Sequence, residues 1–108
     1  MICDRDFGAL AEIVARLRQR GYSILLASDP IDALRQYRES RPSMLLLDGD
    51  CGSEEILRAI RAEDDLTPAI VMLREAGPEN ITSNYYLGAD MVLLKEPVDE
   101  LCQALLGV

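Results

Sequence analysis

The chain contains no histidine and no tryptophan, and only one phenylalanine among its 108 residues. Without histidine, imidazole-based acid–base or nucleophilic catalysis is excluded. The three cysteines, Cys3, Cys51 and Cys102, lack Cys-x-x-Cys spacing, which disfavours zinc and iron–sulfur sites, and their odd number disfavours a disulfide framework. No apolar stretch approaches the roughly 18 residues of a membrane span, and nothing resembles a signal peptide. We expect a cytoplasmic protein with no membrane association.

Positive charge is also scarce. The chain has 11 Lys and Arg residues against 19 Asp and Glu, a formal net charge of −8. Such an acidic domain repels phosphate backbones, so we expect no direct binding to nucleic acid. Hydrophobic residues make up 49% of the chain, enough for one core. The length fits a single domain over residues 1–108.

Strand-like apolar runs alternate strictly with segments of helical spacing. Strands are predicted at residues 2–3, 22–27, 44–48, 69–73 and 91–94. Helical patterns lie between them and after the last one, with start signals near Leu10, Ser28 or Asp29, Ser53, Gly77 and Val98. Crossovers of this kind give parallel strands, right-handed connections and helices on both faces. The sequence therefore predicts an α/β fold with a doubly wound five-stranded parallel sheet, in the order 2-1-3-4-5.

Charged residues follow three of these strands directly. Asp4 and Asp6 come after the first strand, Asp48 ends the third, and Lys95 follows the fifth. Because the carboxyl ends of parallel strands lie along one edge of a sheet, we expect Asp4, Asp48 and Lys95 to converge there. Two carboxylates and an ammonium suit a divalent cation and a phosphoryl group.

The chain resembles the receiver domains of bacterial response regulators, which have a flavodoxin-like, CheY-like (βα)5 fold. The resemblance covers essentially the whole chain. It rests on Asp4, on the stretch Pro-Ser-Met-Leu-Leu-Leu-Asp at residues 42–48, on Leu-Gly-Ala-Asp at 87–90 before Lys95, and on Pro-Glu-Asn-Ile at 78–81. These pieces occur in order and at matching spacing.

The resemblance implies phosphoryl transfer from a partner histidine kinase or phosphotransfer protein to Asp48. Lys95 is then the phosphate clamp, and Asp4 belongs to an acidic pocket for Mg²⁺. The metal ligands implied are Asp4, Asp48 and the backbone carbonyl of Asp50. Two plainer interpretations stay open: Asp48 initiates a turn before Gly49, or Lys95 only extends from a strand end into solvent.

Several positions depart from the family pattern. Arg5 stands where receivers have a second acid, and a guanidinium cannot ligate a metal. Either Arg5 pairs with Asp4 and Asp48 as a metal mimic, or it points to solvent and Asp6 takes over. At the two switch positions, Leu73 replaces the usual Ser or Thr and Val92 replaces an aromatic residue. We therefore expect an atypical receiver with weak or absent Mg²⁺-dependent phosphorylation.

Function is then expected to lie in protein–protein contacts, with an output domain, a partner protein or a second copy. The face formed by the fourth helix, the fifth strand and the fifth helix is the candidate surface, through Tyr85, Tyr86, Val98 and Leu101. Core packing of both tyrosines is the alternative. The competing function is a small flavodoxin-like ligand-binding or enzymatic domain, for which Cys51 is a candidate thiol nucleophile; a small buried or loop cysteine is the alternative interpretation of that residue. A pure dimerisation module is the third possibility.

Overall fold

The computed structural model describes residues 1–4, 8, 10–50, 52–63, 65–75 and 77–106. Within these ranges, five parallel strands form one sheet in the order β2-β1-β3-β4-β5. The elements alternate along the chain: β1 (Ile2–Cys3), α1 (Ala11–Gln19), β2 (Leu26–Ala27), α2 (Pro30–Ser40), β3 (Leu45–Asp48), α3 (Ser53–Ala62), β4 (Ala69–Leu73), α4 (Pro78–Tyr86), β5 (Met91–Leu94) and α5 (Val98–Leu106). The predicted fold class and strand order are confirmed.

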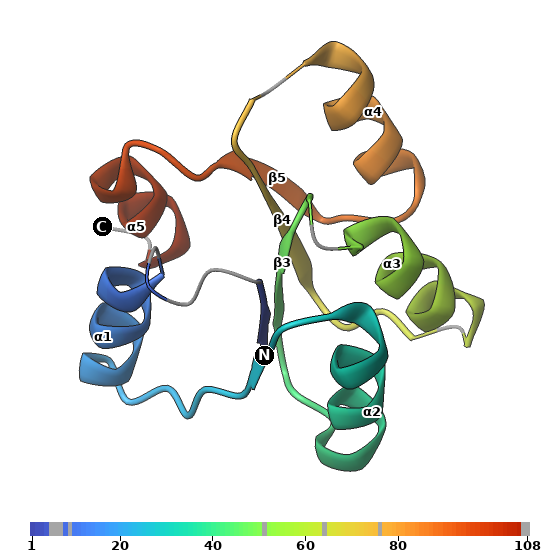
Figure 1. The fold of residues 1–108 in the computed structure, drawn as a ribbon, viewed down its shortest axis with the longest axis horizontal. Coiled ribbons are helices and arrows are strands. Elements are labelled where there is room, and N and C mark those ends of the chain that lie inside the picture. Colours follow the sequence, from blue (N-terminus) through green and yellow to red (C-terminus); the bar gives the residue numbers. More distant parts are fainter. Residues whose placement is uncertain (5–7, 9, 51, 64, 76, 107–108) are drawn as a thin grey trace.

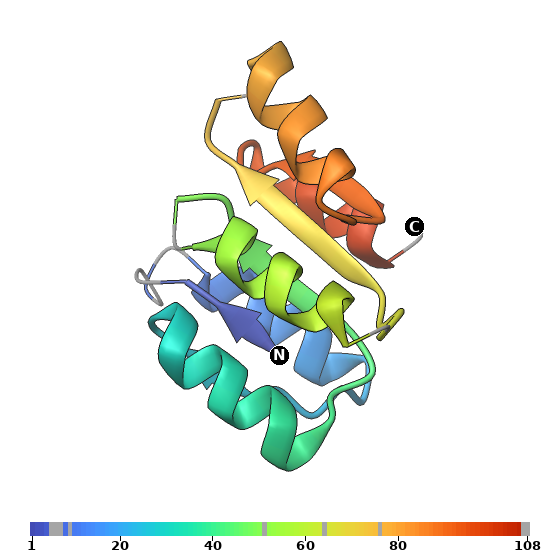
Figure 2. The same cartoon turned by 90° about the vertical axis from the view of Figure 1, so that its right-hand side faces the viewer.

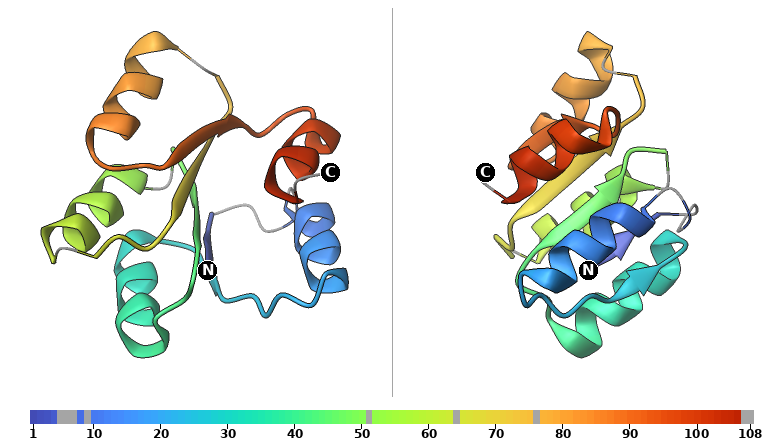
Figure 3. Two further views of the ribbon diagram at one scale, coloured as in Figure 1. Left: turned by 180° about the vertical axis from the view of Figure 1, so that it is seen from behind. Right: turned by 90° about the vertical axis from the view of Figure 1, so that its left-hand side faces the viewer.

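Helices cover both faces of the sheet (Figure 1). Figure 2 shows α2, α3 and α4 in front of the strands, and the two views of Figure 3 show α1 and α5 on the opposite face. The apolar run of β3 follows from this arrangement, since Leu45 and Leu47 join the core under α2 and α3 while Leu46 joins the core under α1 and α5. Each fully buried leucine contributes about 1.5–3 kcal/mol to the free energy of unfolding. None of the described helices is both long enough and apolar enough to span a bilayer.

The second strand is shorter than predicted. The sequence pattern indicates a strand over residues 22–27, but only Leu26 and Ala27 are strand residues. They pair with Ile2 and Cys3 of β1, and the ladder extends backwards only by the hydrogen bond from the Ile2 amide to the Leu25 carbonyl, at 2.8 Å. A strand residue needs a paired neighbour, so the short β1 limits β2.

The second helix has the predicted start. Asp29 is its N-cap, and the Asp29 carboxylate accepts a hydrogen bond of 2.8 Å from the Asp32 amide. Pro30 occupies the first turn, where its missing N–H costs nothing. The helix ends at Ser40, and its C-cap Arg41 has a left-handed backbone (φ 46°) and holds its guanidinium over the Tyr37 ring, 5.1 Å from the centroid.

One arginine fastens three segments at the amino edge of the sheet. The Arg61 guanidinium, on the last turn of α3, donates to the carbonyls of Asp65 (2.7 Å), Thr67 (2.8 Å) and Gly88 (2.9 and 3.1 Å). Gly88 has φ +109°, and a Cβ at that position would lie 2.8 Å from Arg61 Cγ. The turn between α4 and β5 is therefore built around this side chain.

Candidate functional site

Three charged side chains meet at the carboxyl edge of the sheet, as the sequence predicts. Asp4 follows β1, Asp48 is the last residue of β3, and Lys95 follows β5. Lys95 Nζ lies 2.7 Å from Asp4 Oδ2 and 3.1 Å from Asp48 Oδ1. Lys95 is the only lysine of the chain, and it forms ion pairs with both carboxylates at once.

Backbone pairing fixes the positions of these three residues. The ladder continues beyond the strands through the Asp4 amide, which donates to the Ala27 carbonyl at 3.0 Å, and the Lys95 amide, which donates to the Leu73 carbonyl at 2.8 Å. Asp48 itself pairs with Met72 in the ladder between β3 and β4. Parallel pairing therefore brings together side chains that are 91 positions apart in sequence, from Asp4 to Lys95 (95 − 4).

The two carboxylates are removed from solvent. Residue Asp4 is 1% exposed and Asp48 is 6% exposed. Burial raises the pKa of Asp48, and the nearby Asp4 raises it further, against the lowering by the Asp50 amide and Lys95. Burial alone would lower the pKa of Lys95, but hydrogen bonds to Asp4 and Asp48 raise it above its ordinary value. The ammonium stays charged because two buried acids surround it.

Asp48 also shapes the loop that follows it. Its Oδ1 accepts a hydrogen bond of 3.1 Å from the Asp50 amide, a side-chain turn of the kind Asp favours. The plainer interpretation of Asp48 as a turn residue is therefore correct in part, since the same carboxylate forms both the turn and the ion pair with Lys95. For Lys95, extension into solvent is wrong, because its side chain is only 11% exposed.

A leucine closes the site on the β4 side. Leu73 is 5% exposed and packs in the core under α2 and α3. A Cβ on Gly49 would lie 2.3 Å from Leu73 Cδ2, so Leu73 lies directly against the residue that follows Asp48. Leu73 supplies no hydrogen-bond donor there. Val92, the other predicted switch position, is half-buried and packs against the same core.

The described residues do not assemble a complete metal site. No group of three Asp, Glu, Cys or His side chains with metal-ligand geometry occurs among them. The carboxylates of Asp4 and Asp48 are chemically suitable for Mg²⁺, but both contact the Lys95 ammonium. Arg5, Asp6 and Cys51, to which the sequence assigns a metal mimic, an alternative ligand and a nucleophile, lie outside the described residues.

The predicted docking face is only partly exposed. Tyr86 is 88% and Tyr85 45% exposed, so core packing is wrong for Tyr86. The Tyr85 hydroxyl accepts a hydrogen bond of 3.1 Å from the Val92 amide, on the outer edge of β5. Leu101 was predicted to lie on this face, and that prediction is wrong: it is 2% exposed and packs under α1 and α5. Val98 is half-buried against the same core.

A buried polar contact between α3 and α4 was not predicted from the sequence. Ser53, at the first residue of α3, is 1% exposed, and Asn84, in α4, is 4% exposed. The Ser53 hydroxyl donates to Asn84 Oδ1 at 3.1 Å. The sequence indicates this contact only weakly. The α4 segment has few apolar residues at helical spacing, so a polar side chain, Asn84, takes the buried position.

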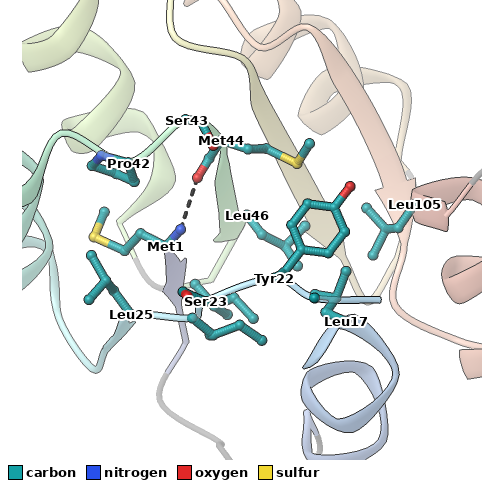
Figure 4. Close-up of a pocket in the computed structure, with 13 residues that line it drawn as sticks. Met1, Leu17, Tyr22, Ser23, Leu25, Pro42, Ser43, Met44, Leu46 and Leu105 are labelled. Atoms are coloured by element: carbon teal, nitrogen blue, oxygen red, sulfur yellow. Dashed lines mark hydrogen bonds between the residues drawn. The ribbon is translucent and has the colours of Figure 1, made fainter. Parts of the chain in front are cut away.

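A cavity of about 670 Å³ lies at the opposite, amino edge of the sheet (Figure 4). Its walls come from the start of β1, residues 21–25 and residues 42–44, together with Leu17, Leu46 and Leu105. The polar contact drawn there joins the Met1 amino group to the Met44 carbonyl, at 2.9 Å. This cavity shares no residue with the Asp4, Asp48 and Lys95 cluster.

Comparisons with known proteins agree with the fold. No family model matches the chain. The transcriptional regulatory protein PrrA of Mycobacterium tuberculosis and that of Mycobacterium leprae are each 29% identical over 98 residues, 88% of this chain. The chain spans only 42% of the length of these curated relatives.

Solved structures of response regulators are similar over nearly the whole chain. The chemotaxis response regulator CheY4 of Vibrio cholerae is 22% identical, with a TM-score of 0.86 over 98% of this chain and 92% of that one. A LuxR-family two-component response regulator from Aurantimonas is 28% identical, with a TM-score of 0.80 over 99% of this chain and 81% of that one. The strand order, the charged residues at three strand ends and these similarities support the predicted resemblance to response-regulator receiver domains.

Proposed function

We propose that the chain, over residues 1–108, is an atypical receiver domain of a two-component system. In this proposal Asp48 is the phosphoacceptor position, its Mg²⁺-dependent phosphorylation is weak, and the domain acts mainly through protein–protein contacts in the cytoplasm. One observation carries the proposal. Lys95 Nζ contacts both Asp4 and Asp48, at 2.7 and 3.1 Å, so the acceptor carboxylate is already neutralised by a residue of the chain.

The chemistry of the acceptor step is simple. An oxygen of the Asp48 carboxylate attacks the phosphorus of a phosphohistidine on a partner kinase or phosphotransfer protein. A P–O bond forms, the P–N bond breaks, and the leaving imidazole nitrogen takes the electron pair and then a proton. Lys95 would pair with the transferred phosphoryl oxygens, and positive charge at that point stabilises the transition state.

Three features of the site support weak phosphorylation. The Asp48 side chain is 8% exposed, so a donor has little access to it. Lys95 must leave at least one carboxylate before it can pair with a phosphoryl group. Leu73 offers no hydroxyl to the product and Val92 is not aromatic, so a phosphoryl group would have neither of the usual parts to move. Mg²⁺ would compete with the Lys95 ammonium for Asp4 and Asp48, which favours weak binding of the cation.

Protein contacts are proposed for the face of α4, β5 and α5. Four of its side chains are well exposed: Tyr85 (45%), Tyr86 (88%), Met91 (41%) and Leu94 (45%). Aromatic residues and methionine are enriched in protein interfaces. An output domain or a second copy of the chain is the proposed partner, in addition to the kinase. The competing function, a ligand-binding or enzymatic domain, gains no support from the cluster around Asp48.

Two measurements test the proposal. The first adds phosphoramidate and millimolar Mg²⁺ to the purified protein and follows intact mass, with Asp48→Asn as the control. We expect a small phosphorylated fraction, which the Asp48→Asn variant lacks entirely. A nearly complete reaction would contradict weak phosphorylation, and an adduct that persists in Asp48→Asn would contradict the acceptor assignment.

The second measurement titrates ¹⁵N-labelled protein with Mg²⁺ and beryllofluoride. We expect no change in the amide shifts around Asp48 at millimolar Mg²⁺, and shifts there would contradict weak cation binding. The predicted role of Arg5 is tested in the same way. If Arg5 acts as a metal mimic, the variant Arg5→Asp gains a response to Mg²⁺. If Arg5→Asp behaves like the native protein, that role is wrong.

A further inference from the structure

The cavity at the amino edge of the sheet lies in line with β1, before its first residue (Figure 4). β1 has only two residues, and it lies between β2 and β3 in the sheet. Residues 22–25 before β2 and residues 42–44 before β3 extend further than β1 and line the cavity on its two sides. Neighbouring strands lie about 4.8 Å apart, so the two stretches are separated by the width of one strand.

Two backbone amides of these stretches, those of Leu25 and Met44, have no hydrogen-bond partner among the described residues. The Leu25 carbonyl accepts a hydrogen bond from the Ile2 amide at 2.8 Å. The Met44 carbonyl accepts one from the Met1 amino group at 2.9 Å. In an extended segment the amide and the carbonyl of one residue point to the same neighbouring strand. Both amides therefore point toward the line of β1, where the cavity lies.

The end of the cavity at β1 carries a positive charge. Met1 is only 9% exposed, and among the described residues its amino group has one hydrogen-bond acceptor, the Met44 carbonyl. An ammonium has three N–H donors, so it can donate to a further acceptor in the cavity. Burial lowers the pKa of this amino group, because the charged form loses hydration, and a carboxylate beside it would stabilise the charge. This ammonium and the two amides favour an acceptor with negative charge.

Much of the remaining cavity wall is apolar, on both faces of the sheet. Its side chains include Leu17, Ile24, Leu25, Leu46 and Leu105. Leu25 packs against the core under α2 and α3, and the other four pack in the core under α1 and α5. Strands buried between two helical layers are apolar on both faces, so a segment that enters here needs apolar side chains at every position. A small anion alone would leave this wall uncovered, whereas a cavity of about 670 Å³ is large enough for a short peptide.

We propose that the cavity binds the free C-terminal tail of a partner protein, as an extended apolar segment of about three residues that runs parallel to β1. The carboxylate of the tail lies at the Met1 amino group, and carbonyl groups of the tail accept from the Leu25 and Met44 amides. The direction follows from the charge, because only a tail that runs parallel to β1 ends in a carboxylate beside the ammonium. An internal segment of a partner would have to continue through Met1. The inference goes beyond the proposed function and does not depend on Asp48.

The probe is the synthetic tripeptide acetyl-Val-Leu-Val with a free C-terminal carboxylate, titrated into ¹⁵N-labelled protein at millimolar concentrations. We expect saturable shifts of the Leu25 and Met44 amides, and no shift of the Asp50 amide at the opposite edge of the sheet. The same tripeptide with a C-terminal amide should bind about tenfold more weakly, because a charge-assisted hydrogen bond is lost. Acetyl-Val-Pro-Val keeps the carboxylate but lacks one backbone N–H, and it should bind about fivefold more weakly.

Two protein variants locate the peptide. Tyr22 lines the cavity and is 52% exposed, so Tyr22→Ala should fold and should weaken binding of the carboxylate peptide by about fivefold through lost contact area. Tyr86→Ala is the matched control, because Tyr86 is the same side chain, 88% exposed, on α4. Its removal should leave the dissociation constant unchanged. If Tyr22→Ala does not fold, the three peptides still test the proposal on the native protein.

Four outcomes would overturn the proposal. Unchanged Leu25 and Met44 amides would show that the cavity binds no such tail. Equal binding of the amide peptide would exclude recognition of a C-terminal carboxylate, and equal binding of acetyl-Val-Pro-Val would exclude pairing as a strand. An equal loss of affinity in Tyr22→Ala and Tyr86→Ala would place the peptide elsewhere. None of these outcomes bears on phosphoryl acceptance by Asp48, which the phosphoramidate reaction measures separately.

Discussion

Replacing Lys95 by methionine tests how the charges of the site are balanced. The substitution keeps an unbranched side chain of similar length but removes the ammonium. Asp4 and Asp48, 1% and 6% exposed, are then left side by side without the cation that lies 2.7 and 3.1 Å from them. Removing one partner of a buried ion pair costs about 3–5 kcal/mol, and the 11% exposure of the Lys95 side chain favours the lower value, about 3 kcal/mol.

This loss is large compared with the stability of a small domain, which is about 5–15 kcal/mol. With a urea m-value of about 1.5 kcal/mol/M, the midpoint of unfolding should fall by about 2 M. The assay is urea denaturation followed by circular dichroism at pH 7. Arg16→Met is the control, because Arg16 forms exposed ion pairs with Glu12 and Asp99, and its loss should lower the midpoint of unfolding far less than Lys95→Met does.

The pH dependence identifies the cause. A raised pKa means that Lys95 adds stability that is fully present below its unfolded pKa of about 10.4 and is lost as the pH rises through the folded value. The raised pKa of Asp48 lowers the free energy of unfolding instead, because a buried carboxylate becomes charged as the pH rises above its unfolded pKa of about 3.9. The native protein and Lys95→Met should therefore differ most near pH 7 and less in acid, where the Asp48 carboxylate becomes protonated.

Magnesium provides a second readout of the same variant. Without the ammonium, Asp4 and Asp48 should bind Mg²⁺ better than in the native protein. With a dissociation constant of about 1 mM, 10 mM Mg²⁺ would restore about 1.4 kcal/mol. A Lys95→Met variant that is as stable as the native protein at pH 7 would refute the charge balance described here. Equal stabilisation of both proteins by Mg²⁺ would refute the competition between Lys95 and the cation.

Three further predictions concern the scaffold and are measured by thermal or urea unfolding. Arg61→Ala should cost about 3 kcal/mol, because the carbonyls of Asp65, Thr67 and Gly88 lose a charged donor. Gly88→Ala should cost about 1–2 kcal/mol, since φ is +109° and the new Cβ meets Arg61. If Gly88→Ala lowers the free energy of unfolding as much in the Arg61→Ala background as in the native protein, the contact with Arg61 is not the cause. Asp29→Ala should cost about 1 kcal/mol by loss of the N-cap, whereas Asp29→Asn should cost little.

Much of this architecture could be predicted because it depends on local patterns. Apolar runs that end in Asp48 or before Lys95 mark strand ends, and parallel crossovers then place those ends along one edge. The strand order and the convergence with Asp4 follow from the same rules. The length of β2 could not be predicted from its own residues, since it depends on how many residues β1 offers for pairing.

Contacts between distant side chains were harder to predict. That one lysine pairs with both Asp4 and Asp48 depends on distances of a few ångströms, which spacing along the chain does not determine. The hydrogen bond between Ser53 and Asn84 joins residues 31 positions apart, and both are polar residues that a pattern normally assigns to the surface. Leu101 was misplaced for the reverse reason, because an apolar residue on a short amphipathic helix fits either the core or an exposed face.

At this site, the stability of the fold and the proposed phosphoryl transfer both depend on the Lys95 ammonium. Its ammonium compensates two buried carboxylates, and the same ammonium must turn to a phosphoryl group if Asp48 is modified. At least one of the contacts that hold Lys95 on Asp4 and Asp48 therefore has to be replaced before the acyl phosphate is stabilised. In the proposed function, a site of this kind favours the unmodified state.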